Sequence, residues 1–541
     1  MDTQRLFLFL IFSFSLIMVW DGWQRYQHPQ AVFASVETKG NVVSTAVSPT
    51  NLAAAITAQP AATTGKIITV KTDTLDVAIN TVGGDIEYLA FLQHPEAKDK
   101  NLPFVLFAKG QGTHNYLAQT GLLGGDLPSH NSIFMADKDA YTLQENAESV
   151  AVLLTVTTSS GITVSKTLTF HKASYLIDVA YQVDNHSATP LTTSAYFQLV
   201  RDSEEPAGGT KFVPTYTGSA VYTDKEKLVK ADFSSIEKGK TDFVKEANNG
   251  WIGLLQHYFV AAWLPKDQAS REYFTRKLDN GLYATGTVLA MPTIAPNASG
   301  NLGLALYVGP AQSSLDTIAP GLGLSVDYGW LTIVAKPMFW MMTWLNGLVH
   351  NWGVAIILLT VLIKLLFFPL SAASYRSMAK MRVVAPKLEK IKLQYSDDRE
   401  KLNRAMMDLY KTEKINPLGG CLPVLIQIPV FIALYWSILE SVEMRYAPFF
   451  GWITDLSVAD PYYILPIIMG ASMILQSKLN PVPPDPMQAK LMQIMPVIFS
   501  VVFFFFPAGL VLYSVVNNVL SIAQQWYITK KLENDSGAVK A

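Results

Sequence analysis

Long apolar stretches dominate the hydrophobic pattern in the second half of the chain. A helix needs about 20 mostly apolar residues to cross the hydrocarbon core of a bilayer. Five stretches come close to or reach that length, over residues 352–370, 421–440, 461–479, 490–507 and 509–528. Only Pro507, Ala508 and Gly509 separate the last two, which predicts an antiparallel helical hairpin. The pattern predicts a core of five transmembrane helices within residues 351–530.

A sixth apolar run lies near the first residue. Fifteen mostly apolar residues follow the polar start that contains Arg5, and no A-x-A cleavage site comes after them. Trp20 and Trp23 suit an interfacial aromatic belt. Residues 1–23 are therefore predicted to be an uncleaved transmembrane anchor with a cytoplasmic N-terminus. Residues 24–65, rich in Ala, Thr and Ser and almost uncharged, predict a flexible linker.

Residues 66–325 follow a different pattern. Short β-branched runs alternate apolar and polar positions and are separated by turn residues such as Gly83 and Gly84. Helical periods are scarce and no βα alternation occurs, so an all-β antiparallel sandwich is predicted rather than an α/β enzyme. Residues 326–350, dense in Trp, Met and Leu and interrupted at Pro337, predict an amphipathic helix at the membrane surface.

The distribution of charge predicts the orientation. Residues 371–416 contain eleven Lys and Arg residues against six acidic residues. In residues 441–460, Arg445 is the only Lys or Arg. The positive-inside rule places the first loop in the cytoplasm and the second outside. The β domain is then outside, and the tail over residues 531–541 is cytoplasmic like the N-terminus. This predicts a multi-pass membrane protein; in a bacterium, outside means the periplasm and the membrane is the inner membrane.

The basic loop itself predicts a cytoplasmic helical hairpin. Apolar residues recur at helical spacing on both sides of Ser396, Asp397 and Asp398, which form a good N-cap turn. Its methionines suit either variable partners or simple packing of the hairpin. The net positive charge is compatible with binding to ribosomal RNA, with binding to anionic lipid headgroups, or with no specific partner. The cationic residues taken as candidates for recruitment are Arg376, Lys380, Arg382, Lys387, Lys390 and Lys392.

One cation lies inside a predicted span. Centring Lys364 in lipid would cost about 2.5–3.5 kcal/mol, so such a residue usually faces a bundle interior or a water-filled cavity. The alternative is snorkelling, in which the aliphatic stem lies along apolar surface and the ammonium reaches the nearer interface.

The other polar residues of the spans concentrate in their cytoplasmic halves. This asymmetry predicts a hydrated groove that opens to the cytosol and ends midway through the bilayer. The alternative is that amides and hydroxyls simply join helices. With Lys364, the predicted groove residues are Thr360, Gln427, Ser472, Gln476, Gln493, Tyr513, Asn517, Ser521 and Gln524.

Composition and absences limit the chemistry. Half of the residues are hydrophobic (50%) and 16% are charged, which is typical of a membrane protein with a sizeable soluble part. The single cysteine, Cys421, rules out an intrachain disulfide. No His follows His350, which disfavours a proton-coupled transporter. Lys364 has no Ser at i±3 or i±4 for a Ser-Lys hydrolase. We therefore predict no catalytic residues, no metal and no cofactor.

Several ordered motifs resemble one family. SMAKMR at 377–382, NPLGGCLP at 416–423, DPYYILP at 460–466, DPMQ at 485–488 and FPAGLVLY at 506–513 are similar to the YidC/Oxa/Alb family, in its Gram-negative form with a large periplasmic domain. The resemblance implies a periplasmic β-supersandwich, an N-terminal and five core transmembrane helices, and an inner-leaflet hydrophilic groove. The family's groove cation is usually Arg, whereas Lys364 stands at the matching position.

The resemblance also implies an activity and its partners. Hydrophobic segments of nascent membrane proteins would enter the groove from the cytosol and be released into the lipid bilayer, by the protein alone or with the Sec translocon. The basic hairpin would recruit ribosomes or nascent chains. A membrane chaperone or scaffold without insertion activity would share most of these features. A secondary transporter would need a path open to both sides, and the apolar outer half of the spans speaks against it.

Overall fold

The computed structural model divides the chain into two compact units, which meet in sequence at Val326 and Asp327 and are described separately here. It describes residues 65–96, 99–111, 114–206, 215–266, 268–278, 280–395, 398–413, 422–480 and 486–538. The predicted anchor over residues 1–23 and nearly all of the predicted linker over residues 24–65 lie outside this range.

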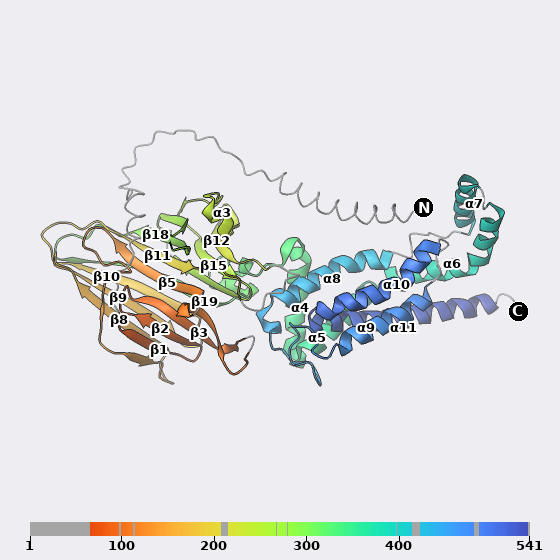
Figure 1. Ribbon diagram of the computed structural model, residues 1–541, viewed down its shortest axis with the longest axis horizontal. Coiled ribbons are helices and arrows are strands. Elements are labelled where there is room, and N and C mark those ends of the chain that lie inside the picture. Colours follow the sequence, from red (N-terminus) through yellow and green to blue (C-terminus); the bar gives the residue numbers. More distant parts are fainter. Residues whose placement is uncertain are drawn as a thin grey trace. The chain divides into compact units, whose positions relative to one another are not determined.

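The β unit consists of two large sheets (Figure 1). The ten-stranded sheet has the order β14-β17-β18-β11-β5-β4-β3-β2-β1-β7, and the nine-stranded sheet the order β13-β12-β15-β16-β19-β10-β9-β8-β6. Neighbouring strands are antiparallel except β1 and β7. The strands are β1 (Ile67–Lys71), β2 (Leu75–Asn80), β3 (Asp85–Pro95), β4 (Pro103–Gln111), β5 (His114–Leu123), β6 (Met135–Ala136), β7 (Ala140–Thr142), β8 (Ser149–Thr157), β9 (Ile162–His171), β10 (Leu176–Asn185), β11 (Ser194–Arg201), β12 (Gly218–Thr223), β13 (Lys227–Ala231), β14 (Glu246–Ala247), β15 (Trp251–Gln256), β16 (Phe259–Leu264), β17 (Arg271–Lys277), β18 (Tyr283–Ala290) and β19 (Ala298–Pro310), with helix α3 (Phe233–Glu237) between β13 and β14.

The two sheets pack face to face, which confirms the predicted all-β sandwich. Strand β9 buries every second residue, as expected when one face of a strand meets a core. Between the sheets, the hydroxyls of Thr120 and Tyr181 lie 2.6 Å apart, and the rings of Phe197 and Trp263 meet edge to face at 5.2 Å.

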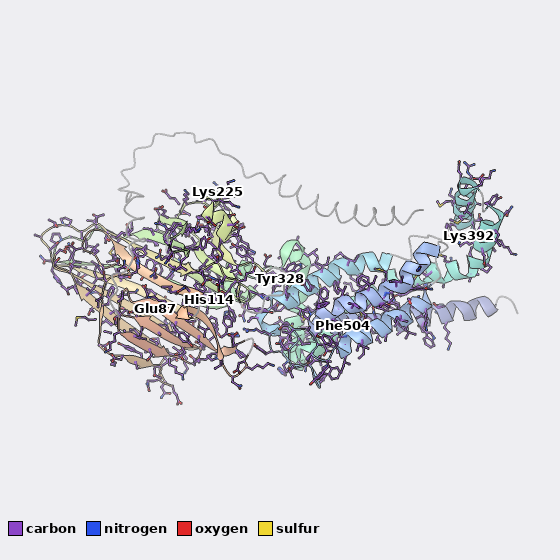
Figure 2. All side chains as sticks on the ribbon, viewed as in Figure 1. Glu87, His114, Lys225, Tyr328, Lys392 and Phe504 are labelled. Carbon is purple, nitrogen blue, oxygen red and sulfur yellow. The ribbon has the colours of Figure 1, made fainter. Side chains whose placement is uncertain are left out.

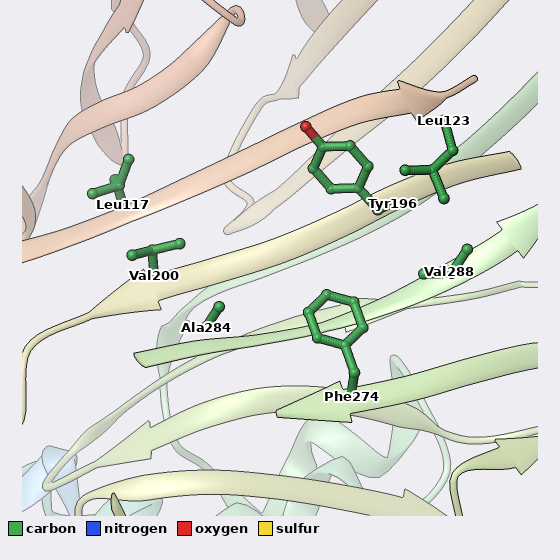
Figure 3. Close-up of a cluster of buried hydrophobic side chains, with 7 residues drawn as sticks. All are labelled: Leu117, Leu123, Tyr196, Val200, Phe274, Ala284 and Val288. Atoms are coloured by element: carbon green, nitrogen blue, oxygen red, sulfur yellow. The ribbon is translucent and has the colours of Figure 1, made fainter. Parts of the chain in front are cut away.

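The ten-stranded sheet also buries side chains on its other face. Every residue of β11 is buried, so its side chains are covered on both sides of the sheet. Phe197 meets Trp263 of the second sheet, so its neighbour Tyr196 lies on the face that points away from that sheet. Figure 3 shows the cluster that includes Tyr196, formed by Leu117, Leu123, Tyr196, Val200, Phe274, Ala284 and Val288.

A lysine occupies an inward position of this sandwich. Lys166 lies among the apolar residues of β9 with 1% of its surface exposed. Its ammonium donates to the carbonyls of Gly83 at 2.9 Å and Gly84 at 2.8 Å. Both glycines have left-handed backbone, with φ of 74° and 62°, where other residues are strained. The turn predicted at these glycines is therefore held by a cation from the opposite sheet.

The second unit is helical. Its described helices are α4 (Thr332–Val349), α5 (Trp352–Leu366), α6 (Phe368–Gln394), α7 (Arg399–Thr412), α8 (Leu422–Glu440), α9 (Ile464–Leu479), α10 (Pro486–Val502) and α11 (Ala508–Ala538). Short 3-10 turns lie in the β unit at Ser313–Thr317 and Leu322–Ser325, and in this unit at Gly329–Leu331, Val442–Met444 and Phe503–Phe505.

The first predicted span is bent in the structure. The stretch over residues 352–370 was expected to be one helix, but α5 ends at Leu366 and the chain turns by 66° into α6. Within the described residues no single helix has both the length and the apolarity to cross a membrane, whereas α5 joined to Phe368–Met381 does. Shorter apolar helices cover Gln427–Glu440, Ile464–Leu479 and Gln493–Phe505.

Helix α4 is apolar on two sides. Met338, Phe339 and Met342 are buried where α4 contacts α5 and α8. The opposite side exposes Trp340 and Trp344, so the residues predicted as an interfacial helix form a helix with one packed and one exposed aromatic face.

Helix α9 packs against both of the last two predicted spans. The turn at Pro507 is tight, as predicted, and α11 begins at the next residue. However, α10 packs against α9, and α11 makes its most extensive helix contact with α9 as well. The predicted hairpin therefore has its tight turn, but both of its helices pack mainly against α9.

The basic segment forms the predicted helical hairpin. The carboxylate of Asp398 accepts a hydrogen bond from the backbone N–H of Lys401, so Asp398 is the N-cap of α7. Val384 and Leu388 of α6 pack against Tyr410 of α7. Partly buried methionines join this cluster, which favours the packing interpretation for them.

We predict that Lys166→Met strongly destabilises the β unit. The substitution leaves two turn carbonyls without their donor and removes the cation that interacts with the buried carboxyl of Asp85. Breaking such a buried set costs about 3–5 kcal/mol. Hydrogen exchange of β9 and β10 in the full-length protein measures the change. Lys172→Met, at an exposed lysine, is the matched control and should change stability by less than about 0.5 kcal/mol. Equal exchange in the two variants would contradict the assigned role.

The Asp178 cluster predicts a pH dependence. Burial acts to raise the pKa of Asp178, but hydrogen bonds from Lys266 at 2.9 Å and His171 at 2.7 Å outweigh it, so the pKa is lowered. This stabilisation is present above the unfolded carboxyl value near 3.9 and is lost as pH falls through the lowered folded value. Asp178→Asn should cost about 0.5–1 kcal/mol at pH 7, because the group is partly exposed. The difference in unfolding free energy between Asp178→Asn and wild type should vanish below about pH 3 in urea unfolding. A difference that stays the same at every pH would refute the assigned role of Asp178.

Candidate functional site

A small cavity in the helical unit brings the predicted cation together with other polar groups. Its volume is about 30 Å³, room for about two water molecules. Helices α5, α6, α8 and α11 contribute the lining. Half of the lining residues are polar, and the full set is Ile363, Lys364, Phe367, Leu370, Ser371, Gln427, Val430 and Asn517.

Lys364 lies in the last turn of α5, where the helix dipole favours a cation. Its ammonium donates to the hydroxyl of Ser521 on α11 at 2.7 Å. Among the residues that the structure describes, no carboxylate forms an ion pair with it. The site is therefore a half-buried cation held by a neutral acceptor.

The pairing of Lys364 with Ser521 places a Ser beside a Lys, which sequence reasoning on a single helix did not detect. A Ser-Lys hydrolase needs the serine proton to pass to the lysine nitrogen. Here the Ser521 hydroxyl donates to the backbone carbonyl of Asn517 at 2.7 Å, while the lysine is the donor to the serine oxygen. The arrangement holds a charge rather than activating a nucleophile.

The predicted polar stripe of α11 faces the cavity side. Tyr513 accepts a hydrogen bond from Gln427 of α8 at 2.8 Å, and Asn517 lines the cavity one turn further on. Gln524 donates to the carbonyl of Phe368 at the start of α6, at 3.3 Å. The stripe therefore contacts α5, α6 and α8, as expected for residues at i, i+4, i+8 and i+11.

Four predicted groove residues lie elsewhere. Thr360 is buried and donates to the carbonyl of Ile356 in its own helix at 2.7 Å. Ser472 lies between α9 and α11, Gln476 is partly exposed on α9, and Gln493 is exposed on α10. None of the four lines the cavity.

A second polar stripe on α11 joins this helix to α9 and was missed. Asn518 donates to Ser472 at 3.1 Å, and Gln525 donates to the carbonyl of Leu479 at 3.0 Å. Asn518 and Gln525 follow the first stripe by one position at two of its steps, which is the sequence signal that could have identified them. This stripe fits the alternative interpretation, in which amides hold helices together.

The candidate recruitment residues lie on α6. Arg376, Lys380, Lys387 and Lys390 are exposed, and Figure 2 shows Lys392 on the same helix. Lys387 forms an ion pair with Glu413 at 2.6 Å. The side chain of Arg382 lies outside the described part of the structure.

One group in the β unit has ligand types that suit a metal. His114, Asp202 and Glu204 bring their ligand atoms within 4.8 Å of one another. The carboxylate of Asp202 already accepts hydrogen bonds from the backbone N–H groups of Asn115 and Glu204 and contacts His114 at 3.2 Å. These bonds account for the arrangement without an ion.

The two polar stripes of α11 predict opposite solvent access for adjacent residues. In a background in which Cys421 is replaced by Ser, Asn517→Cys should react rapidly with a small charged thiol reagent because it lines a cavity with room for water. Asn518→Cys should react at least tenfold more slowly, because Asn518 is buried against α9. Equal rates would contradict the assignment of a hydrated side.

Comparisons with known proteins agree with the motifs. The family described as YidC periplasmic domain matches residues 67–341, and the family described as 60Kd inner membrane protein matches residues 344–535. A membrane protein insertase YidC of Methylobacillus flagellatus is 51% identical over 550 residues, which cover 100% of this chain and 99% of the relative. One of Nitrosospira multiformis is 50% identical over 560 residues, covering 99% of this chain and 98% of the relative.

A crystal structure of an active YidC insertase with its first transmembrane domain resolved is 18% identical, covers 86% of this chain and 95% of that chain, and has a TM-score of 0.40. The assignment rests on the sequence matches, which confirm the resemblance seen in the motifs. This chain belongs to the YidC family of membrane protein insertases.

Proposed function

We propose that the protein receives hydrophobic segments of nascent membrane proteins beside the Lys364 cavity, where the polar tail of the client meets the ammonium, and releases them sideways into the lipid bilayer. The observation that carries the proposal is a half-buried cation at the end of the apolar helix α5, in a cavity where half of the lining residues are polar. Water and fixed dipoles in such a cavity lower the barrier that the polar tail of a client must cross. No catalytic step is needed, because burial of the client in lipid supplies the driving force.

A multi-pass arrangement in the inner membrane is part of this proposal. Large apolar side chains are exposed on α5, α9, α10 and α11, a distribution expected where lipid covers the helices. They are Leu362, Leu365, Leu366, Ile467, Ile468, Ile474, Leu475, Ile494, Val497, Ile498, Phe499, Val501, Val502, Val519, Trp526 and Tyr527. The positive-inside rule places the α6–α7 hairpin and both termini in the cytoplasm and the β unit in the periplasm.

The positive charge gives the cavity a preference among clients. An ammonium attracts the acidic residues of a tail that must pass to the periplasm, and it does so more strongly where water is restricted. Because Ser521 is a neutral partner, no protein carboxylate has to be displaced before a client carboxylate binds. Clients without acidic residues gain nothing from this charge.

The hairpin suits the recruitment of clients at the cytoplasmic entrance. Exposed cations on α6 provide a surface for ribosomal RNA, and Val383 and Leu393 expose apolar area beside them. We propose the ribosome and nascent membrane proteins as partners at this surface. The Sec translocon is proposed as a further partner on the strength of the family resemblance.

Reversal of the cavity charge tests the proposal. The full-length protein is reconstituted in liposomes with a single-span client, and the protease-protected translocated tail is measured. Lys364→Glu should reduce insertion of a client with an acidic tail about tenfold, which corresponds to about 1.4 kcal/mol of lost attraction and added repulsion. Lys364→Arg keeps the charge and should stay within about threefold of wild type.

The controls separate the possible failures. A client whose acidic residues are replaced by their amides should insert equally into liposomes that contain wild type or Lys364→Glu. If Lys364→Glu inserts the acidic client as well as wild type does, the electrostatic role is wrong. If folded wild type inserts no client, the protein acts as a scaffold beside another translocase, and the proposed function is wrong.

A further inference from the structure

Two helices of the helical unit meet at one serine oxygen. Lys364 of α5 donates to the hydroxyl of Ser521 on α11 at 2.7 Å. Ser521 itself donates to the carbonyl of Asn517 at 2.7 Å. A hydroxyl has one hydrogen and two lone pairs. Because its hydrogen is already given to the Asn517 carbonyl, Ser521 meets Lys364 as an acceptor.

This oxygen determines where the ammonium lies. A lysine side chain has four flexible carbons and can carry its charge along apolar surface to a nearby interface. Lys364 lies two residues from the end of α5, so such a path is short. Among the described residues the structure gives Ser521 as its hydrogen-bond acceptor, and Ser521 is buried, with 3% of its surface exposed. Loss of this acceptor would release the ammonium from the cavity.

Tyr375 packs the helix of the basic hairpin against the helix that carries Ser521. Its ring is buried with Ala372 of α6 and Ile528 of α11. Helix α6 is continuous from Phe368 to Gln394, about 40 Å at 1.5 Å per residue. The helix that bears the exposed cations is therefore packed against the helix that holds the Lys364 ammonium.

We propose that Ser521 is a positioning residue that holds the Lys364 ammonium in the cavity and thereby sets the preference for clients with acidic tails. The inference rests on the proposed function. It adds one specificity-determining residue, which contacts the cation rather than the client.

The test compares substitutions at Ser521 that differ only in the hydroxyl. The full-length protein in liposomes of phosphatidylethanolamine and phosphatidylglycerol is given two single-span clients, one with three Asp in its tail and one with three Asn. The ratio of acidic to neutral insertion is the readout. Ser521→Thr keeps the hydroxyl and should preserve the ratio, whereas Ser521→Val, of the same shape, should lower it about threefold.

In a Lys364→Met background, which has no ammonium to hold, Ser521→Val should have no further effect on the ratio.

Each outcome decides the inference. Equal ratios for Ser521→Thr and Ser521→Val overturn it, as does a loss that affects both clients alike, because that indicates a purely structural role. If wild type inserts both clients with a ratio of one, the charge role is overturned and the inference with it, while insertion itself stands. If wild type inserts neither client, the proposed function has failed instead.

Discussion

The hydrogen bond between Lys364 and Ser521 is the constraint on which the helical unit depends. A half-buried ammonium is costly in apolar surroundings and needs an acceptor within reach. Ser521 supplies that acceptor from α11, across 157 positions of sequence. Helix α5 ends two residues after Lys364, near the cavity, and the chain turns there by 66° into α6. The bend places the start of α6 in the cavity wall and leaves the rest of the helix for the basic hairpin.

Helix α11 has two polar stripes with different roles, one that packs against a neighbouring helix and one on the cavity side. Asn518 and Gln525 bond to α9 and hold the helices together, while Asn517 lines the cavity and Ser521 holds the cation. Adjacent residues of one type thus serve different ends because each step along a helix turns the side chain by about 100°. In the β unit the buried cation is structural, since Lys166 of one sheet donates to the turn at Gly83 and Gly84 of the other sheet.

Much of this could be predicted from sequence, since periodicity and charge report on whole elements. The β sandwich follows from alternation in strands such as β9, and the hairpin from its basic residues and the cap at Asp398. Lys364 was identified because a cation in an apolar stretch is rare. Its partner was found only in the structure, because depth along each helix cannot show which faces meet. Ser472 was predicted for the groove on its depth in the membrane alone. In the structure this residue of α9 faces α11, where it accepts a hydrogen bond from Asn518.

Site-specific crosslinking during insertion tests the central claim most directly. A photoreactive amino acid is placed at Asn517, which lines the cavity, or at Val519, which is exposed on another side of α11. Ribosomes stalled with a hydrophobic client segment just outside the exit tunnel are added to the reconstituted protein. The account predicts crosslinks from Asn517 to the segment while it is held, and their loss once the client is released into lipid. Equal crosslinking from both positions, or none from Asn517, would contradict entry on the cavity side of α11.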